Sequence, residues 1–359
     1  MKKLLLTFAC LTTLFSGVAM GQGTKKITLE DIWASNKFNP YGISAIRSMN
    51  DGEHYCILTR NGIEKYAYKT GEKVASVCIF NAPGQIKAKP LPPIEDYTFS
   101  ADEKKILLQT EFEPIYRHSG VSNYYIYDVS EGTFTKISNE GKQRLTTLSP
   151  DGTKVAFVRD NNLFVMDLTS LEETQVTKDG MMNHIIYGTT DWVYEEEFAI
   201  TQGFYWSPDS KKIAFYRFDE SKVKEFTMQN WGELYPDNYT YKYPKAGEDN
   251  SVVDILIYDL ASQKTLKLNT GSENDQYLPR MKWTRDANVL AFMRMNRLQN
   301  HMELLLANAS TGAITPLYSE KDEAYVEVPD TWVFLQDGKN WLITSERNGY
   351  NHIYMYDMQ

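Results

Sequence analysis

The sequence predicts an all-β protein built as a β-propeller, in which small antiparallel sheets called blades follow one another around an axis. Three observations predict this fold. A turn motif containing Asp recurs six times, an apolar strand follows each turn, and aromatic residues are abundant, with 24 Tyr, 16 Phe and 7 Trp. Short strands repeated at this interval are typical of propeller blades, and aromatic side chains suit sheets that pack face to face.

The turn motifs set the period of the repeat. They begin at Met49, Ser100, Ser149, Ser207, Thr284 and Leu335, so successive starts are 51, 49, 58, 77 and 51 residues apart. In Ser149-Pro-Asp-Gly, Pro fixes φ, Asp bonds its own backbone and Gly accepts positive φ. The two longer intervals carry insertions, which include Glu195–Thr201 and Glu225–Asn250. A generic β-sandwich is the alternative, and six regular recurrences favour a propeller of about five and a half blades.

Two cysteines follow the first turn. Glu53–Arg60, Ile63–Lys69 and Lys73–Phe80 read as three consecutive strands, with Cys56 and Cys78 on the outer two. Two inter-strand spacings separate the cysteines by roughly 9–10 Å, whereas a disulfide needs Cα atoms within about 7 Å. We therefore expect free, buried thiols.

The start of the chain has the pattern of a signal peptide. Lys2 and Lys3 precede the apolar run Leu4–Phe15, and Ala19-Met-Gly resembles a cleavage site. The apolar run is shorter than the ~20 residues that a membrane-spanning helix needs. We expect residues 1–21 to be a signal peptide and the protein to be exported, either periplasmic or secreted.

Two further segments follow the expected signal peptide. Residues 22–48 are expected to form an N-terminal segment with a short helix near Thr28–Ala34, because Thr28 and Asp31 have the spacing of a capping box. Residues 49–359 are expected to form the incomplete propeller. The last repeat stops directly after the strand Ile353–Asp357, where earlier repeats continue into a further strand. This ending predicts that the chain is part of a longer protein.

Charge and metal-ligand patterns narrow the classes of function. The formal net charge is −9 and becomes −11 without residues 1–21, which contain two lysines and no acidic residue. This charge argues against nucleic acid as a partner. The five histidines are scattered and there is no HExxH or CxxC motif. We expect no metal site and no cofactor.

The most informative stretch is Asp191-Trp-Val-Tyr-Glu-Glu-Glu, which ends at Glu197. Three adjacent carboxylates repel one another, and the nearest Lys or Arg residues are Lys178 and Lys211. Facing solvent, the run would be an ordinary acidic helix start, which the helix dipole favours. Facing a cavity, two of the carboxylates would converge where a cation binds. The residues alone leave both interpretations open.

The chain resembles a known family in four segments. They are Asp191–Glu197, Tyr205–Pro208, Tyr243–Gly247 and Tyr116–Ser119. From about Ile27 to its end, the sequence resembles the N-terminal half of dipeptidyl peptidase IV, a family of membrane-bound or exported prolyl-specific serine exopeptidases. In that family an eight-bladed propeller caps a C-terminal α/β-hydrolase domain.

The resemblance implies a role for three residues. Glu196 and Glu197 would hold the free α-ammonium of a peptide substrate, and Arg117 would hold the carbonyl of its first residue. Without the resemblance, Arg117 reads as a surface arginine on a hairpin. Glu195 is expected to face away, and Glu195→Gln is expected to be a mild control. The resemblance also implies a homodimer, since Glu225–Asn250 lies where relatives extend an arm to a partner subunit.

Catalytic residues are not expected within this chain. The family uses Ser, Asp and His on its hydrolase domain, with Ser in a Gly-x-Ser-x-Gly elbow. The nearest match, Gly42-Ile-Ser-Ala-Ile, lacks the second Gly. The resemblance thus implies a full-length serine dipeptidyl peptidase that releases Xaa-Pro dipeptides, with Xaa-Ala as a further substrate class, from which this chain lacks the catalytic domain. The alternative is a free-standing propeller that binds a peptide or a protein partner without catalysis.

Overall fold

The computed structural model describes residues 26–40, 42, 45–81 and 90–358. The chain divides into two compact units, residues 1–44 and residues 45–359. The predicted signal peptide, residues 1–21, lies outside the described residues. Within the described part of the chain, no helix has the length and apolar character needed to cross a membrane.

The first unit contains one short helix, α2 (Leu29–Trp33). The hydroxyl of Thr28 accepts a hydrogen bond from the Asp31 backbone N–H, and the Asp31 carboxylate accepts one from the Thr28 N–H. This reciprocal pair is the capping box that the sequence predicted. The short helix expected near Thr28–Ala34 is therefore confirmed.

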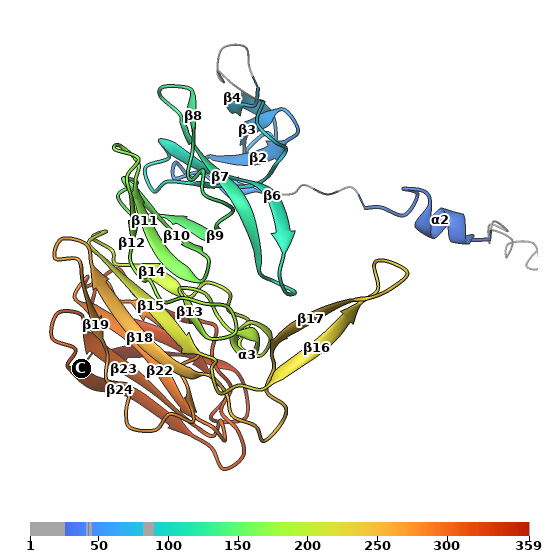
Figure 1. The fold of residues 1–359 in the computed structure, drawn as a ribbon. Coiled ribbons are helices and arrows are strands. Elements are labelled where there is room, and N and C mark those ends of the chain that lie inside the picture. The colour runs from blue at the N-terminus through green and yellow to red at the C-terminus, as the bar shows by residue number, and fades with distance from the viewer. Residues whose placement is uncertain (1–25, 41, 43–44, 82–89, 359) are drawn as a thin grey trace, which may run out of the picture. The chain divides into compact units, whose positions relative to one another are not determined.

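The second unit consists of successive antiparallel sheets (Figure 1). The first sheet contains β1 (Arg47–Ser48), β2 (His54–Thr59), β3 (Gly62–Ala67) and β4 (Lys73–Ile79). The second contains β5 (Ile94–Phe99), β6 (Lys105–Pro114), β7 (Gly120–Asp128) and β8 (Thr133–Lys136). The third contains β9 (Arg144–Leu148), β10 (Lys154–Arg159), β11 (Asn162–Asp167) and β12 (Glu173–Gln175).

Three more sheets follow. The fourth contains β13 (Ile185–Tyr187), β14 (Phe204–Trp206), β15 (Lys212–Asp219), β18 (Val252–Asp259) and β19 (Lys264–Lys267). The fifth contains β20 (Gln276–Tyr277), β21 (Met281–Trp283), β22 (Val289–Asn296), β23 (His301–Asn308) and β24 (Ile314–Lys321). The sixth has three strands, β25 (Trp332–Phe334), β26 (Asn340–Ser345) and β27 (His352–Asp357). These are propeller blades, as predicted.

The first sheet also bears on the cysteines. Strand β1 pairs with β2 through Arg47 and Ser48, so the sheet begins before residue 49. Cys56 on β2 and Cys78 on β4 flank the central strand β3, and both are free and buried, as predicted. Burial raises the pKa of the Cys56 thiol to about 11 and that of Cys78 to about 12.

Three of the six recurring turns are held by the same set of hydrogen bonds. In the third sheet, Ser149 Oγ donates to Asp151 Oδ1 (2.6 Å) and accepts from the Lys154 backbone N–H (2.9 Å). The same two bonds recur in the turns that begin at Ser100 and Ser207. In these three turns the bonds fix the register between the inner strand of a sheet and the strand after it, which is why the motif predicted the sheets.

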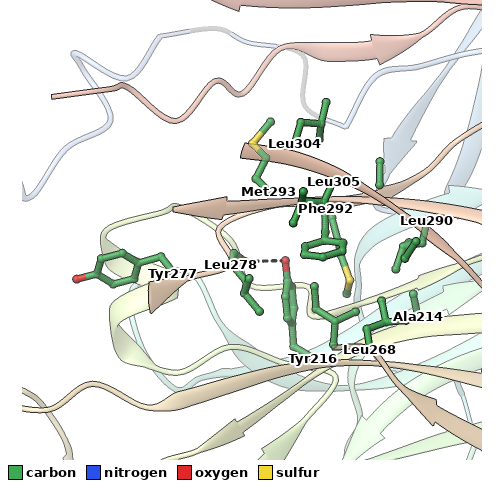
Figure 2. Close-up of a cluster of buried hydrophobic side chains, with 14 of the residues drawn as sticks. Ala214, Tyr216, Leu268, Tyr277, Leu278, Leu290, Phe292, Met293, Leu304 and Leu305 are labelled. Atoms are coloured by element: carbon green, nitrogen blue, oxygen red, sulfur yellow. Dashed lines mark hydrogen bonds between the residues drawn. The ribbon is translucent and has the colours of Figure 1, made fainter. Parts of the chain in front are cut away.

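Buried side chains fill the spaces between consecutive sheets. Four apolar clusters follow one another along the second unit, and the largest spans sheets four to six. Figure 2 shows part of this cluster, where Tyr216 of β15 lies among Leu268, Leu278 and Phe292. The Tyr216 hydroxyl donates a hydrogen bond to the carbonyl of Leu278 (2.9 Å). Sheets four and five are therefore joined by apolar packing and by a satisfied buried polar group.

The fourth sheet departs from the simple pattern in its inner strand. Both β13 and β14 pair with β15, and the 16 residues 188–203 that separate them leave the sheet. Gly188 has φ +67°, and a Cβ on Gly203 would lie 2.5 Å from the Thr189 carbonyl oxygen. Glycine is needed at both ends of this excursion, because other residues would be strained or would clash. The excursion carries the helix α3 (Trp192–Glu196).

A second insertion lies between β15 and β18 of the same sheet. It forms a two-stranded hairpin, β16 (Glu225–Asn230) with β17 (Asp237–Lys242), which Figure 1 draws as a separate ribbon beside α3. Large apolar side chains at its turn, Trp231, Leu234 and Tyr235, are exposed. Both insertions expected from the irregular spacing are thus present in one sheet.

Candidate functional site

Helix α3 begins at a buried aspartate. Asp191 is the N-cap, and its Oδ1 accepts a hydrogen bond from the Tyr194 backbone N–H (2.9 Å). Its Oδ2 accepts one from the hydroxyl of Ser251 (2.6 Å), at the start of β18. Burial raises the pKa of Asp191, and the hydrogen bonds from Ser251 and Tyr194 oppose that effect. The cap therefore fixes both the start of the helix and its place on the sheet.

One face of α3 is buried against the fourth and fifth sheets. Tyr194 is buried, and its ring packs near Phe198 and Phe218. Its hydroxyl accepts a hydrogen bond from the Leu278 N–H (2.8 Å). The carbonyl of the same residue accepts the hydrogen bond from the Tyr216 hydroxyl. A five-residue helix is unstable by itself. Its orientation therefore depends on these contacts.

Glu195 is also buried, with no exposed surface, but against a different part of the protein. Its Oε1 accepts hydrogen bonds from the backbone N–H groups of His118 (2.8 Å) and Ser119 (2.9 Å). These two residues follow Arg117 in the turn between β6 and β7. Glu195 points away from the open side of the site, as predicted, and it fastens the turn that carries Arg117.

Glu196 contacts the same turn through the side chain of Arg117. The Arg117 Nε lies 3.0 Å from Glu196 Oε2 and 3.4 Å from Oε1. The Glu196 side chain is 17% exposed and that of Arg117 is 72% exposed. Residues 79 positions apart in sequence thus form an ion pair at an accessible surface.

Glu197 ends the helix as its C-cap and is exposed. It borders a cavity of about 370 Å³ whose lining also includes Arg280, Glu327 and Asp330. Arg280 is paired with Asp330 (2.6 Å). Among the described residues, the Glu197 carboxylate has neither an ion pair nor a hydrogen bond. This cavity therefore holds more negative than positive charge.

Buried charges lie behind the Arg117 turn. A second cavity, of about 410 Å³, is lined by Tyr116, Arg144, Glu220 and Tyr239 among others. Burial lowers the pKa of Arg144, and the Glu195 carboxylate is the strongest of the charges that oppose this shift. Burial raises the pKa of Glu220 to about 8, with the charge of Asp191 adding to the shift. The Arg117 turn is thus backed by a hollow that buried charged groups border.

Of the three residues that the sequence singled out, the structure places two in direct contact, Arg117 and Glu196. Glu197 is the chain neighbour of Glu196, on the side of the smaller cavity. Sequence reasoning missed the Glu195 contact with the turn and the Asp191–Ser251 bond. No local pattern announces them, because each joins segments at least 60 residues apart. Among the described residues, no three potential metal ligands lie together.

The fold and the site define a class of protein, a propeller that presents an arginine–glutamate ion pair and, on the next residue of the helix, an exposed carboxylate. A family described as "Dipeptidyl peptidase IV (DPP IV) N-terminal region" matches residues 100–359. The chain therefore belongs to the dipeptidyl peptidase IV family and contains its N-terminal region.

Individual relatives agree with this assignment. A probable dipeptidyl-aminopeptidase B of Tuber melanosporum is 32% identical and aligns with 82% of this chain and 36% of its own length. The dipeptidyl-aminopeptidase B of Aspergillus niger is 32% identical and aligns with 94% of this chain and 42% of its own length. The crystal structure of Porphyromonas gingivalis dipeptidyl peptidase 4 matches with a TM-score of 0.85 and 38% identity, over 94% of this chain and 48% of that one. The chain thus spans less than half the length of these relatives.

The buried contacts of Glu195 change one expectation from the sequence. Glu195→Gln is not a neutral control, because the Glu195 carboxylate accepts two hydrogen bonds from the Arg117 turn. Its negative charge also stabilises the positive charge of Arg144. We expect Glu195→Ala to lower the free energy of unfolding by about 2–4 kcal/mol, since it leaves two backbone N–H groups without an acceptor. Glu195→Gln keeps one acceptor oxygen and is expected to lose less. Urea unfolding measures both, with the exposed Glu172→Gln as control; equal stability of Glu195→Ala and the control would contradict the assigned role.

Proposed function

We propose that this chain is the substrate-binding propeller of an exported serine dipeptidyl peptidase. In this proposal residues 1–21 direct export to the periplasm or the exterior. Glu196 and Glu197 hold the α-ammonium group at the N-terminus of a peptide. Family membership and the names of the relatives support the peptidase class, and the geometry around α3 supports the roles of the individual residues.

One observation carries the proposal: Glu196 and Glu197 lie at the C-terminal end of α3. The helix dipole favours carboxylates at the N-terminal end and disfavours them at the C-terminal end. The interpretation as an ordinary acidic helix start therefore does not apply to these two residues. Arg117 offsets one of the two charges, so the pair retains a net negative charge. A cationic ligand would relieve the repulsion.

The chemistry of an α-ammonium suits this arrangement. An ammonium group has three N–H donors, and bonds from a cation to carboxylates are stronger than neutral ones. Arg117 offers further donors in a fixed plane. Its exposed side chain could bind the first carbonyl of the peptide while Nε remains on Glu196. The site thus provides acceptors for the amine and donors for the adjacent carbonyl.

A fixed amine site would determine the length of the product. We propose that the nucleophilic serine, its histidine and its aspartate belong to a C-terminal α/β-hydrolase domain outside this chain. The distance between that serine and Glu196 would set cleavage after the second residue, because a longer N-terminal extension has no room. The products would be Xaa-Pro dipeptides, with Xaa-Ala as a further class.

A propeller that binds peptides without catalysis is the alternative function. It would use the same two carboxylates, and a propeller fold alone does not distinguish a binding protein from the substrate-binding part of an enzyme. The relatives are named as dipeptidyl-aminopeptidases and are more than twice as long as the aligned region. These two facts favour the enzyme.

The hairpin β16–β17 supports a further proposal, that the full-length protein is a homodimer. Trp231, Leu234 and Tyr235 at its turn are 66%, 86% and 82% exposed. Large apolar side chains grouped on a surface indicate an interaction site. A second copy of the chain is the partner that the family resemblance implies.

The amine site is tested in the full-length protein. Glu196→Gln and Glu197→Gln are each expected to reduce kcat/KM for an Xaa-Pro substrate with a free N-terminus by about 10- to 150-fold. Each change removes one charge-assisted hydrogen bond, which contributes roughly 1.5–3 kcal/mol. Arg117→Ala is expected to cause a similar loss. A small acylating probe should label the serine at the wild-type rate in all three variants.

The control for this experiment is Glu172→Gln, which removes an exposed carboxylate far along the chain from the site. It is expected to match wild type. If Glu196→Gln and Glu197→Gln also match wild type on dipeptide substrates, the carboxylates do not bind the amine and the proposal is wrong.

The chain by itself is expected to have no peptidase activity, because it contains no Gly-x-Ser-x-Gly elbow to present a serine nucleophile. Purified residues 22–359 are to be incubated with an Xaa-Pro chromogenic substrate beside a mock preparation. Release of chromophore above the mock preparation would contradict the expectation.

The dimer is tested by replacing apolar side chains at the hairpin turn. The double variant Trp231→Ser, Leu234→Ser in the full-length protein is expected to sediment as a monomer at concentrations where wild type is a dimer. Thr227→Ala, on the exposed part of β16, is the matched control and should leave the mass unchanged. A dimer of undiminished stability in the double variant would exclude the turn as the contact.

A further inference from the structure

We infer that the hairpin β16–β17 positions Arg117 for substrate binding, and that Tyr116 is the residue through which it acts. The inference rests on the proposed function, since it concerns the same site. It assigns a role to residues that do not themselves touch the substrate. Tyr116, Tyr239 and Tyr241 are positioning residues in this account.

The Arg117 turn has little packed core behind it. Tyr116 lines the cavity of about 410 Å³ together with the charged Arg144 and Glu220. Glu195 bonds the backbone on the other side of Arg117, at His118 and Ser119. Segments with few packed contacts open easily. The conformation of residue 116 therefore depends on whatever holds its ring.

The hairpin supplies that contact. The ring of Tyr116 lies 5.7 Å from the ring of Tyr241 and 6.5 Å from that of Tyr239, between centroids. Tyr239 and Tyr241 also stack on each other at 5.5 Å. Aromatic pairs at these separations are stabilising. Burial raises the pKa of Tyr116, which agrees with a ring enclosed by its neighbours.

The same strand reaches the acidic side of the site. Tyr243, directly after β17, packs its ring 4.4 Å from that of Trp192, the first residue of α3. Tyr241 and Tyr243 lie 6.1 Å apart. Alternate residues of a strand share one face, so Tyr239, Tyr241 and Tyr243 form a row. One end of this row contacts the turn of Arg117 and the other contacts the helix of Glu196.

This arrangement sets the separation between Arg117 and Glu196. Glu195 bonds the turn after Arg117, and the tyrosine row holds the residue before it. The guanidinium is mostly exposed, so its own packing does not fix it. Loss of the row would leave the turn held only through its backbone, by the Glu195 bonds and by the Ile115 N–H bond to the Ser119 carbonyl (2.8 Å), and nothing would then hold the Tyr116 ring next to Arg117. Small displacements of a group that orients a substrate strongly weaken its effect.

The experiment is a double-mutant cycle in the full-length protein, with KM and kcat measured on a free N-terminal Xaa-Pro substrate. Tyr116→Ala is expected to raise KM about tenfold with kcat nearly unchanged. Tyr241→Ala should do the same, while Tyr116→Phe retains the ring and should match wild type. In an Arg117→Ala background, Tyr116→Ala should add little, because its effect passes through Arg117. Thr227→Ala is the control on the same hairpin.

The possible outcomes separate the two proposals. If Arg117→Ala is impaired but Tyr116→Ala and Tyr241→Ala are not, the positioning role is wrong and the amine site stands. Equal, additive losses in the wild-type and Arg117→Ala backgrounds would show that Tyr116 acts on general stability, which also overturns the inference. If Arg117→Ala itself matches wild type, the assigned role of Arg117 fails and the inference falls with it. Labelling of the serine by the acylating probe reports that the catalytic domain of each variant is folded, and urea unfolding reports the stability of the propeller.

Discussion

The site depends on how a five-residue helix is held. Helix α3 is too short to be stable by itself, so tertiary contacts decide where its carboxylates point. Asp191 caps it and bonds Ser251, and Tyr194 bonds the backbone of Leu278. With these two contacts in place, Glu195 turns inward and Glu196 turns outward. The neighbouring carboxylates therefore have different roles because the sheets on either side fix the rotation of the helix.

The division of roles explains how three adjacent acidic residues are tolerated. Glu195 is compensated by two backbone N–H groups and by the nearby charge of Arg144. Glu196 is compensated by Arg117. Glu197 has no ionic partner among the described residues and borders an acidic cavity. The uncompensated charge lies at the position where the proposed ligand brings a positive one.

The sequence predicted the sheets well, because each turn carries its own hydrogen bonds. Ser149, Asp151 and Lys154 lie within six residues, so their pattern is visible without the fold. Through the resemblance to a family it also singled out Arg117 and Glu196, which form an ion pair. It did not predict the contacts of Glu195 or of Tyr116. These contacts arise from the packing of separate sheets and of the inserted hairpin, although the alternation of Tyr239, Tyr241 and Tyr243 was a readable sign of one aromatic face.

The central claim is that Glu196 and Glu197 recognise the positive charge of a peptide N-terminus. The most direct measurement compares an Xaa-Pro substrate with its des-amino counterpart, in wild type and in the Glu196→Gln, Glu197→Gln double variant. Wild type is expected to prefer the amine strongly, and the double variant is expected to lose about 100-fold or more of that preference in kcat/KM. An undiminished preference in the double variant would contradict the account, because the amine would then be recognised elsewhere.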